Sequence, residues 1–145
     1  MLLWVALLSV MGCGDDSSDL QVRFQMQTIG CNQPGLSAYL QVTGVPGVCE
    51  LNIGEDRTVS GRCAAVPTGA VRIFRLVYFF RMPGERPVNV DLARISVELD
   101  LRNETRTSIV LAFPADRLVT SMDDDDDGRS NLTEFCEGTD PTTRD

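Results

Sequence analysis

The sequence predicts an all-β fold, in which residues 20–118 form an antiparallel β-sandwich of about seven strands. Apolar and polar residues alternate with a period of two along most of this region, as in strands with one buried face. Glycine, proline and asparagine separate the alternating segments, at QPG, GVPG, PTG, MPGERP and RNET. Short strands with frequent turns in about 100 residues are typical of a sandwich.

The expected strands follow from the alternation, taken in chain order. It starts with the apolar positions Leu20, Val22, Phe24 and Met26, and returns in residues 38–42, 49–53, 95–101 and 109–113. The apolar run 70–80, AVRIFRLVYFF, predicts a central strand that is covered on most of both faces. Around Leu92 and Ala93 the phase of the alternation reverses, which indicates a bulge or two separate strands.

One segment of the body also resembles known modules. Residues 66–78, VPTGAVRIFRLVY, are loosely similar to the P-x-G strand of transthyretin-like and immunoglobulin-like modules in bacterial surface proteins. The resemblance concerns the fold alone and implies a sandwich.

The N-terminus has the pattern of a targeting segment. Residues 2–11 are an apolar run that is too short to span a bilayer and has the length of a signal-peptide core. Residues 10–13, VMGC, resemble a bacterial lipobox, which implies that residues 1–12 are removed and that Cys13 is lipidated. Residues 13–19 would then be a lipidated cysteine with a flexible tether, and the protein would be anchored in the cell envelope, on the periplasmic or cell-surface side of a bacterial membrane. The alternative is an ordinary secreted protein that is cut near this point.

The cysteines fit an oxidising compartment. If Cys13 carries lipid, four cysteines remain, and they can form two disulfides in three different ways. Cys49 and Cys63 flank a plausible hairpin with its turn at GED, so we expect this pair to be bridged. Cys31 and Cys136 then form the second pair by elimination. The alternative is that some of these cysteines are free buried thiols.

The composition excludes several classes of function. The net charge of −8 is local, because residues 123–145 hold nine acids and two arginines, a net charge of −7. The rest is close to neutral, which argues against a nucleic-acid partner. The chain has neither histidine nor lysine, so Ser/His or Cys/His nucleophile pairs, Schiff bases and histidine-bound zinc are excluded. The body's acids are scattered singly, and we expect no enzymatic activity.

Residues 123–134, DDDDDGRSNLTE, have the spacing of a twelve-residue EF-type calcium loop. Calcium takes six to eight oxygen ligands, and the loop supplies them in a fixed order, with a glycine at the sixth position. Gly128 stands at that position. The expected ligands are Asp123, Asp125, Asp127, Arg129 through its carbonyl oxygen, Asn131 and Glu134. A solvated acidic tail would explain the aspartates but not Gly128, Asn131 and Glu134. Asp124 and Asp126, at the even positions, should point outward.

A short C-terminal helix is expected after the loop, over residues 132–137. Gly138 should end this helix as a C-terminal cap, and Phe135 should pack on the sandwich.

Residues 119–145 resemble a bacterial thrombospondin type 3-like repeat. The matching pattern is D-x-D-x-D-G, then Asn131, Glu134, the run GTDP at 138–141 and a closing Asp145. The resemblance implies a calcium site to which Asp140 and Asp145 could add oxygens. A dockerin pairs two such segments, and a full EF-hand needs an entering helix, for which Pro114 and the following short polar run leave little room.

Three functions are compatible with this reading. The first is a non-catalytic, lipid-anchored envelope protein with a structural calcium site. The second is a carbohydrate- or protein-binding, adhesin-like module with an extracellular ligand, for which the aromatic residues are Tyr39, Tyr78, Phe79 and Phe80. The only tryptophan, Trp4, lies in the signal segment. The third is an enzyme based on carboxylates, which no motif supports.

Overall fold

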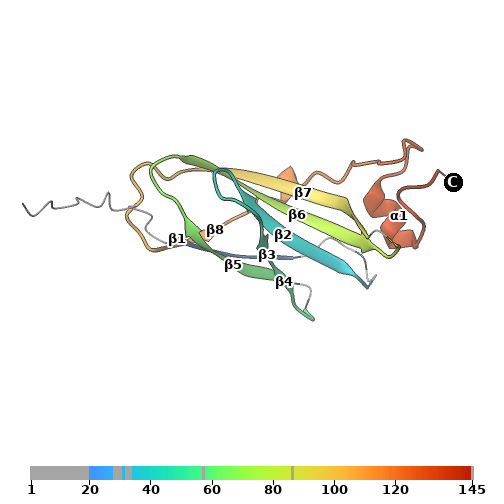
Figure 1. Cartoon of the computed structure of the whole chain (residues 1–145), viewed down its shortest axis with the longest axis horizontal. Helices are drawn as coiled ribbons and strands as arrows, with labels where there is room; N and C mark the ends of the chain where they lie inside the picture. The colour runs from blue at the N-terminus through green and yellow to red at the C-terminus, as the bar shows by residue number, and fades with distance from the viewer. Residues whose placement is uncertain (1–19, 28–30, 32–33, 57, 86, 145) are drawn as a thin grey trace, which may run out of the picture.

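The computed structural model describes residues 20–27, 31, 34–56, 58–85 and 87–144, and these form an all-β protein, as predicted (Figure 1). The described strands make two four-stranded sheets, and one short helix, α1, lies at the C-terminal end of the molecule. The first sheet has the order β4 (Asn52–Ile53), β5 (Thr58–Val66), β1 (Leu20–Gln27), β8 (Ser108–Leu111). The second has the order β3 (Cys49–Glu50), β2 (Leu36–Val42), β6 (Val71–Met82), β7 (Val88–Asp100).

The two sheets contribute to one hydrophobic core. In β2 the alternation predicted from the sequence is confirmed, because Ala38, Leu40 and Val42 are buried. They belong to one cluster with Phe74 and Leu76 of β6, and β5 and β8 of the other sheet add to the same cluster. β6 pairs with β2 on one side and β7 on the other, so the apolar run 70–80 does form a central strand. It is covered on both faces only around residues 76–78, because Val71 and Ile73 near its start are exposed.

The reversal of phase near Leu92 is a bulge within one long strand. Tyr78 of β6 lies opposite Ala93, whereas the next residue, Phe79, lies opposite Asp91. Leu92 is therefore an extra residue in β7. Both Leu92 and Ala93 are fully buried, although neighbouring residues of a regular strand face opposite sides.

One strand pair departs from the antiparallel arrangement that the sequence predicts. β1 and β8 pair in parallel, with Val22 opposite Ile109, whereas the other described pairs are antiparallel. Consecutive strands joined by a hairpin must run antiparallel, but β1 and β8 are the first and last strands of the body. No turn fixes their relative direction, so local sequence signals contain no information about this pairing.

Both expected disulfides are present, but one has a different structural basis. Cys49 and Cys63, with Cα atoms 5.5 Å apart, form one bridge, and Cys31 and Cys136, also at 5.5 Å, form the other. Cys49 lies in β3 and Cys63 in β5, which belong to different sheets. The predicted hairpin does exist, as β4 and β5, but Cys49 precedes it, so the bridge joins the two sheets instead of two neighbours in a hairpin.

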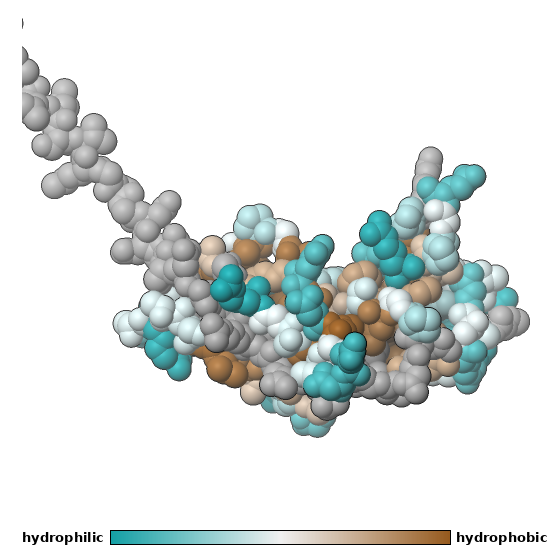
Figure 2. Space-filling view, turned by 90° about the horizontal axis from the view of Figure 1, so that it is seen from below, coloured by the Kyte–Doolittle hydropathy of each residue, from teal (hydrophilic) through white to brown (hydrophobic). Residues whose placement is uncertain are grey.

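The surface mixes apolar and polar residues. Figure 2 shows brown apolar patches separated by projecting teal hydrophilic side chains on the face seen from below. The most exposed large apolar residue among those described is Val110 of β8, which is 81% exposed. Single exposed apolar residues of this kind are normal on soluble proteins.

The predicted signal peptide, Cys13 and the tether of residues 13–19 lie outside the described residues. Within the described part of the chain, no helix has the length and apolar character needed to cross a membrane.

Candidate metal centre

The C-terminal segment begins at the free edge of β7. The backbone of Val119 exchanges two hydrogen bonds with Arg94 of that strand, at 2.8 and 2.9 Å. The acidic residues follow directly, and helix α1 (Asn131–Glu137) comes after them. The acidic loop is therefore placed beside the edge of the second sheet.

Helix α1 has a local signal at each end. The Ser130 hydroxyl accepts a hydrogen bond from the Thr133 backbone N–H at 3.2 Å, which caps the N-terminus. Gly138 adopts the left-handed conformation, with φ of 79°, and ends the helix as the sequence predicts. The helix starts one residue before the predicted range, at Asn131.

The helix is fastened to the body by packing and by a covalent bond. Phe135 is 5% exposed and belongs to the main hydrophobic core cluster, as expected. Its ring centroid lies 5.0 Å from that of Phe80 in β6. The next residue, Cys136, is bridged to Cys31. The end of the acidic loop is therefore held at a fixed place on the body.

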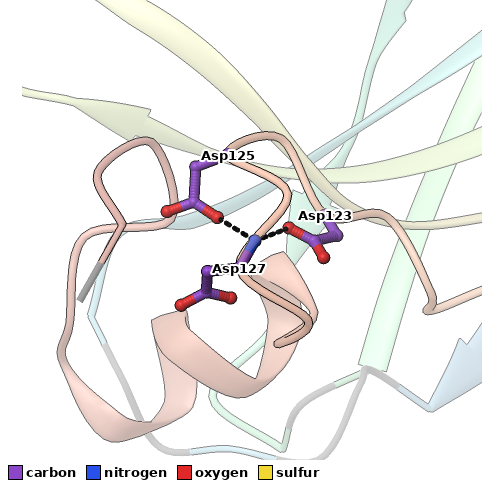
Figure 3. A group of neighbouring side chains, drawn as sticks. All are labelled: Asp123, Asp125 and Asp127. Atoms are coloured by element: carbon purple, nitrogen blue, oxygen red, sulfur yellow. Dashed lines mark hydrogen bonds between the residues drawn. The ribbon is translucent and has the colours of Figure 1, made fainter.

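Three alternate aspartates of the loop converge. Carboxylate oxygens of Asp123, Asp125 and Asp127 all lie within 4.8 Å of one another, and Figure 3 shows the three side chains gathered around the backbone of the turn. These three side chains are half-buried, whereas Asp124 and Asp126 are exposed. The predicted alternation of inward and outward carboxylates is thus confirmed.

Backbone N–H groups of the turn hold these carboxylates in place. The Asp127 N–H lies 3.3 Å from Asp123 Oδ1 and 3.2 Å from Asp125 Oδ1, the two contacts drawn in Figure 3. The Gly128 N–H donates to Asp123 Oδ2 at 2.9 Å. Gly128 has φ of 92°, in the region that favours glycine, so the sharp turn at the sixth position is present.

Asp125 gives the strongest indication that the cluster can bind a cation. Its Oδ2 atom is buried and has no hydrogen-bond partner among the described residues. Loss of solvent raises the pKa of Asp125 above its ordinary value; the bond from the Asp127 N–H opposes this, and the charges of Asp127 and Asp123 add to it. A cation within the cluster would stabilise this oxygen and relieve the repulsion between the carboxylates.

Asn131 has a supporting role in the structure that the loop pattern does not show. Its side chain is fully buried, its Oδ1 accepts a hydrogen bond from the Asp124 N–H at 2.9 Å, and its Nδ2 donates to the Asp91 carbonyl oxygen at 2.9 Å. Its own backbone N–H donates to the Met122 carbonyl oxygen at 2.7 Å. The residue therefore clamps the start of the loop against β7.

The other expected ligands are placed as follows. Glu134 is fully buried in α1, beside Phe135, but its carboxylate is not a member of the three-aspartate group. The Arg129 backbone N–H donates to Asp127 Oδ1 at 2.7 Å, and its guanidinium pairs with Glu137. Asp140 is exposed, and the N–H and hydroxyl groups of its own turn occupy its carboxylate. Asp145 lies outside the described residues.

Two residues near the loop were not found from the sequence. Asp91 anchors Asn131 from 40 positions away, and burial, followed by the charge of Asp124, raises its pKa. Arg144 donates from Nε to the Asp125 carbonyl oxygen at 2.6 Å. Neither position carries a local signal, because each contact depends on how distant segments pack.

The donor set of this centre is made of oxygen. Carboxylate oxygens suit hard cations such as calcium, magnesium and manganese, and the described cluster offers neither thiolate nor imidazole. The three aspartates could therefore hold a hard metal ion.

The chain matches no family model, no curated protein and no solved structure.

Proposed function

We propose that residues 123–134 bind one calcium ion, and that the protein is a non-catalytic, lipid-anchored domain of the cell envelope in which this ion is structural. The observation that carries the proposal is the convergence of Asp123, Asp125 and Asp127 on one point, with a buried, unpaired oxygen of Asp125 among them. The first, third and fifth positions are those that supply side-chain oxygens in an EF-type loop.

Burial of Glu134 supports the same site. A carboxylate without solvent exposure loses the hydration that stabilises its charge, and a nearby cation compensates for that loss. Glu134 occupies the twelfth position, at which the loop pattern requires a bidentate carboxylate. It would complete the shell from the first turn of α1 if the helix or the loop moves so that its carboxylate joins the three aspartates.

Calcium is favoured over magnesium by the kind of ligand. Magnesium requires a near-ideal octahedron and keeps several waters, whereas calcium accepts irregular cages of six to eight oxygens, including carbonyl groups. A loop that offers four carboxylates and one backbone carbonyl fits the larger ion. Extracellular sites of this class have dissociation constants of about 10⁻⁴ to 10⁻³ M, which suits a structural ion in a calcium-rich surrounding.

Two carboxylates of the body that line a common hollow are unsuited to acid–base catalysis, which is consistent with the proposed non-catalytic role. One hollow of about 300 Å³ is lined by two of them, Asp100 and Glu104. Each is hydrogen-bonded to a nearby arginine, Arg102 or Arg106, and these contacts lower both pKa values to about 2. A general acid near neutral pH needs a raised pKa, so this pair is unsuited to acid–base chemistry.

The proposed location rests on the two disulfides and on the N-terminal pattern. Two bridged pairs are typical of proteins outside the cytoplasm. With the apolar run 2–11 and Cys13, this supports anchoring by lipid at Cys13 after removal of residues 1–12. Mass spectrometry of the mature N-terminus tests the anchor: any start other than an acylated Cys13 would refute it.

The calcium site is tested by thermal unfolding with and without calcium. At 10 mM calcium and a dissociation constant of about 10⁻⁴ M, binding should stabilise the wild type by about 2.7 kcal/mol. Asp125→Asn and Glu134→Gln should lose most of this gain, whereas Asp124→Asn, at an exposed position, should retain it. Equal small losses in all three variants would mean that the run acts only as a diffuse acidic surface.

A further inference from the structure

The outer face of the second sheet is hollowed beside its short edge strand, β3. The hollow has a volume of about 500 Å³, large enough for one or two sugar rings. It lies on strands β2, β3, β6 and β7, apart from the aspartate cluster. Its lining side chains include two aromatic rings and three long polar groups: Tyr39, Phe79, Glu50, Arg81 and Asn89.

The two rings belong to the surface and not to the core. Tyr39 follows Ala38, and Phe79 follows Tyr78, and both of these preceding residues are buried in the main cluster. Because successive side chains of a strand point to opposite faces, Tyr39 and Phe79 point outward. They are half-buried, and their ring centroids lie 5.5 Å apart with an angle of 51° between the ring planes. The two rings therefore form an apolar part of the wall of the hollow.

The polar groups around these rings are available to a ligand. Glu50, Arg81 and Asn89 are exposed, and their side chains make no hydrogen bond or ion pair with another residue of the described part. Glu50 can accept hydrogen bonds, Arg81 can donate them, and Asn89 can do both. The charges of Glu50 and Arg81 cancel, so the rim of the hollow is polar without a net charge.

We propose that this hollow binds a neutral saccharide. A pyranose whose hydroxyl groups are equatorial exposes a C–H face that can stack on Tyr39 and Phe79, while its hydroxyl groups both donate and accept at the rim. An anionic ligand would meet the charge of Glu50, and a cationic one that of Arg81. A charge-balanced rim around two aromatic rings therefore fits a neutral polyhydroxyl ligand best.

The site is a binding function beyond the structural calcium ion, and it does not depend on that ion. The hollow is formed by strands of the body, and none of its lining residues belongs to the acidic loop. A failure of the saccharide proposal can therefore be distinguished from a failure of the calcium proposal, because saccharide binding is measured both with calcium and with a chelator.

The test is a titration of the mature, disulfide-bonded protein with cellotriose and with chitotriose up to 20 mM, followed by amide shifts in NMR spectra. We expect binding of at least one of the two, with shifts on β2, β3 and β6. Tyr39→Ala and Glu50→Gln should each weaken it at least tenfold, whereas Tyr39→Phe, which keeps the ring, should weaken it less. Glu98→Gln, an exposed carboxylate of β7 outside the hollow, is the matched control and should bind as the wild type does.

The fold of each variant is checked by its amide spectrum without ligand. The proposal is overturned if neither trisaccharide shifts these strands at 20 mM, or if Tyr39→Ala folds normally and binds as tightly as the wild type. It is also overturned if the shifts appear only with a charged peptide of similar size, because the hollow would then recognise protein and not sugar.

Discussion

Asn131 Nδ2 donates a hydrogen bond to the Asp91 carbonyl oxygen over 2.9 Å, and this contact joins the first residue of α1 to the bulged region of β7. The same side chain accepts from the Asp124 N–H at 2.9 Å. One buried amide thus ties together the acidic loop, the helix and the body.

Replacing Asn131 with alanine should destabilise the protein by about 2–4 kcal/mol, because two partly buried backbone groups lose their partners and a fully buried side chain is removed. Chemical unfolding without calcium measures the loss. Asn103→Ala, at an exposed turn, is the control and should stay within about 0.5 kcal/mol of the wild type. Similar small effects at both positions would contradict a stabilising role for the hydrogen bonds of Asn131.

Two glycines in similar conformations separate backbone strain from metal binding. Gly128 and Gly47 have φ of 92° and 78°, and a Cβ atom at either position would meet no atom within 4 Å. Alanine at either position should therefore destabilise the protein by about 1 kcal/mol through strain alone. Only Gly128→Ala should also weaken calcium binding, measured by calorimetry. If Gly47→Ala reduced calcium affinity equally, the turn at Gly128 would not belong to the site.

The two disulfides should differ in their effect on the metal site. The Cys31–Cys136 bridge joins two residues that are 105 positions apart in the sequence. A double alanine variant without this bridge should have a free energy of unfolding lower by about 4–5 kcal/mol, because its unfolded chain gains entropy. Because Cys136 lies in α1, calcium should also bind more weakly. The Cys49–Cys63 double variant also loses stability but should keep the calcium affinity of the folded protein. Equal calcium affinities in the two variants would show that the bridge at α1 does not position the loop.

Stability at alkaline pH should depend on Tyr78. Burial raises the pKa of this fully buried tyrosine to about 12, whereas the phenol ionises near pH 10 in the unfolded chain. The neutral form therefore contributes stability that is complete below pH 10 and is lost as the pH rises from 10 to about 12, by about 3 kcal/mol in all.

Absorbance at 295 nm measures the titration of the two tyrosines of the chain. Tyr78 should ionise near pH 12 or on unfolding, and Tyr78→Phe should flatten the loss of stability above pH 10. The control is Tyr39→Phe, which removes the tyrosine of the outer face, whose pKa is also raised by partial burial. Two equal, normal titrations near pH 10 would contradict the burial of Tyr78.

The features that the sequence predicted are those set by neighbouring residues. The alternate aspartates, the turn at Gly128 and the helix end at Gly138 depend on spacing along a few residues, and the structure contains all three. The sequence also indicated an irregularity near Leu92, as a bulge or a break between two strands, because an inserted residue shifts the apolar alternation; the structure contains the bulge.

The remaining features depend on how distant segments meet. The parallel pairing of β1 with β8, the position of Cys49 in the other sheet, and the contact between Asn131 and Asp91 each join residues that no turn connects. The aromatic residues show the same limit. Alternation can tell that Tyr39 and Tyr78 lie in strands, but only the assembled sheets show that Tyr39 faces the outer hollow and Tyr78 the core.

The Cys31–Cys136 bridge also determines which parts of the chain can bear mechanical load. Strands β2 to β8 and the acidic loop lie between the two cysteines, whereas β1 precedes Cys31. A force that pulls the two ends of the chain apart passes directly from Cys31 to Cys136 through a covalent bond. Such a force can peel β1 from its neighbours, but it cannot extend the segment that holds the second sheet and the aspartate cluster.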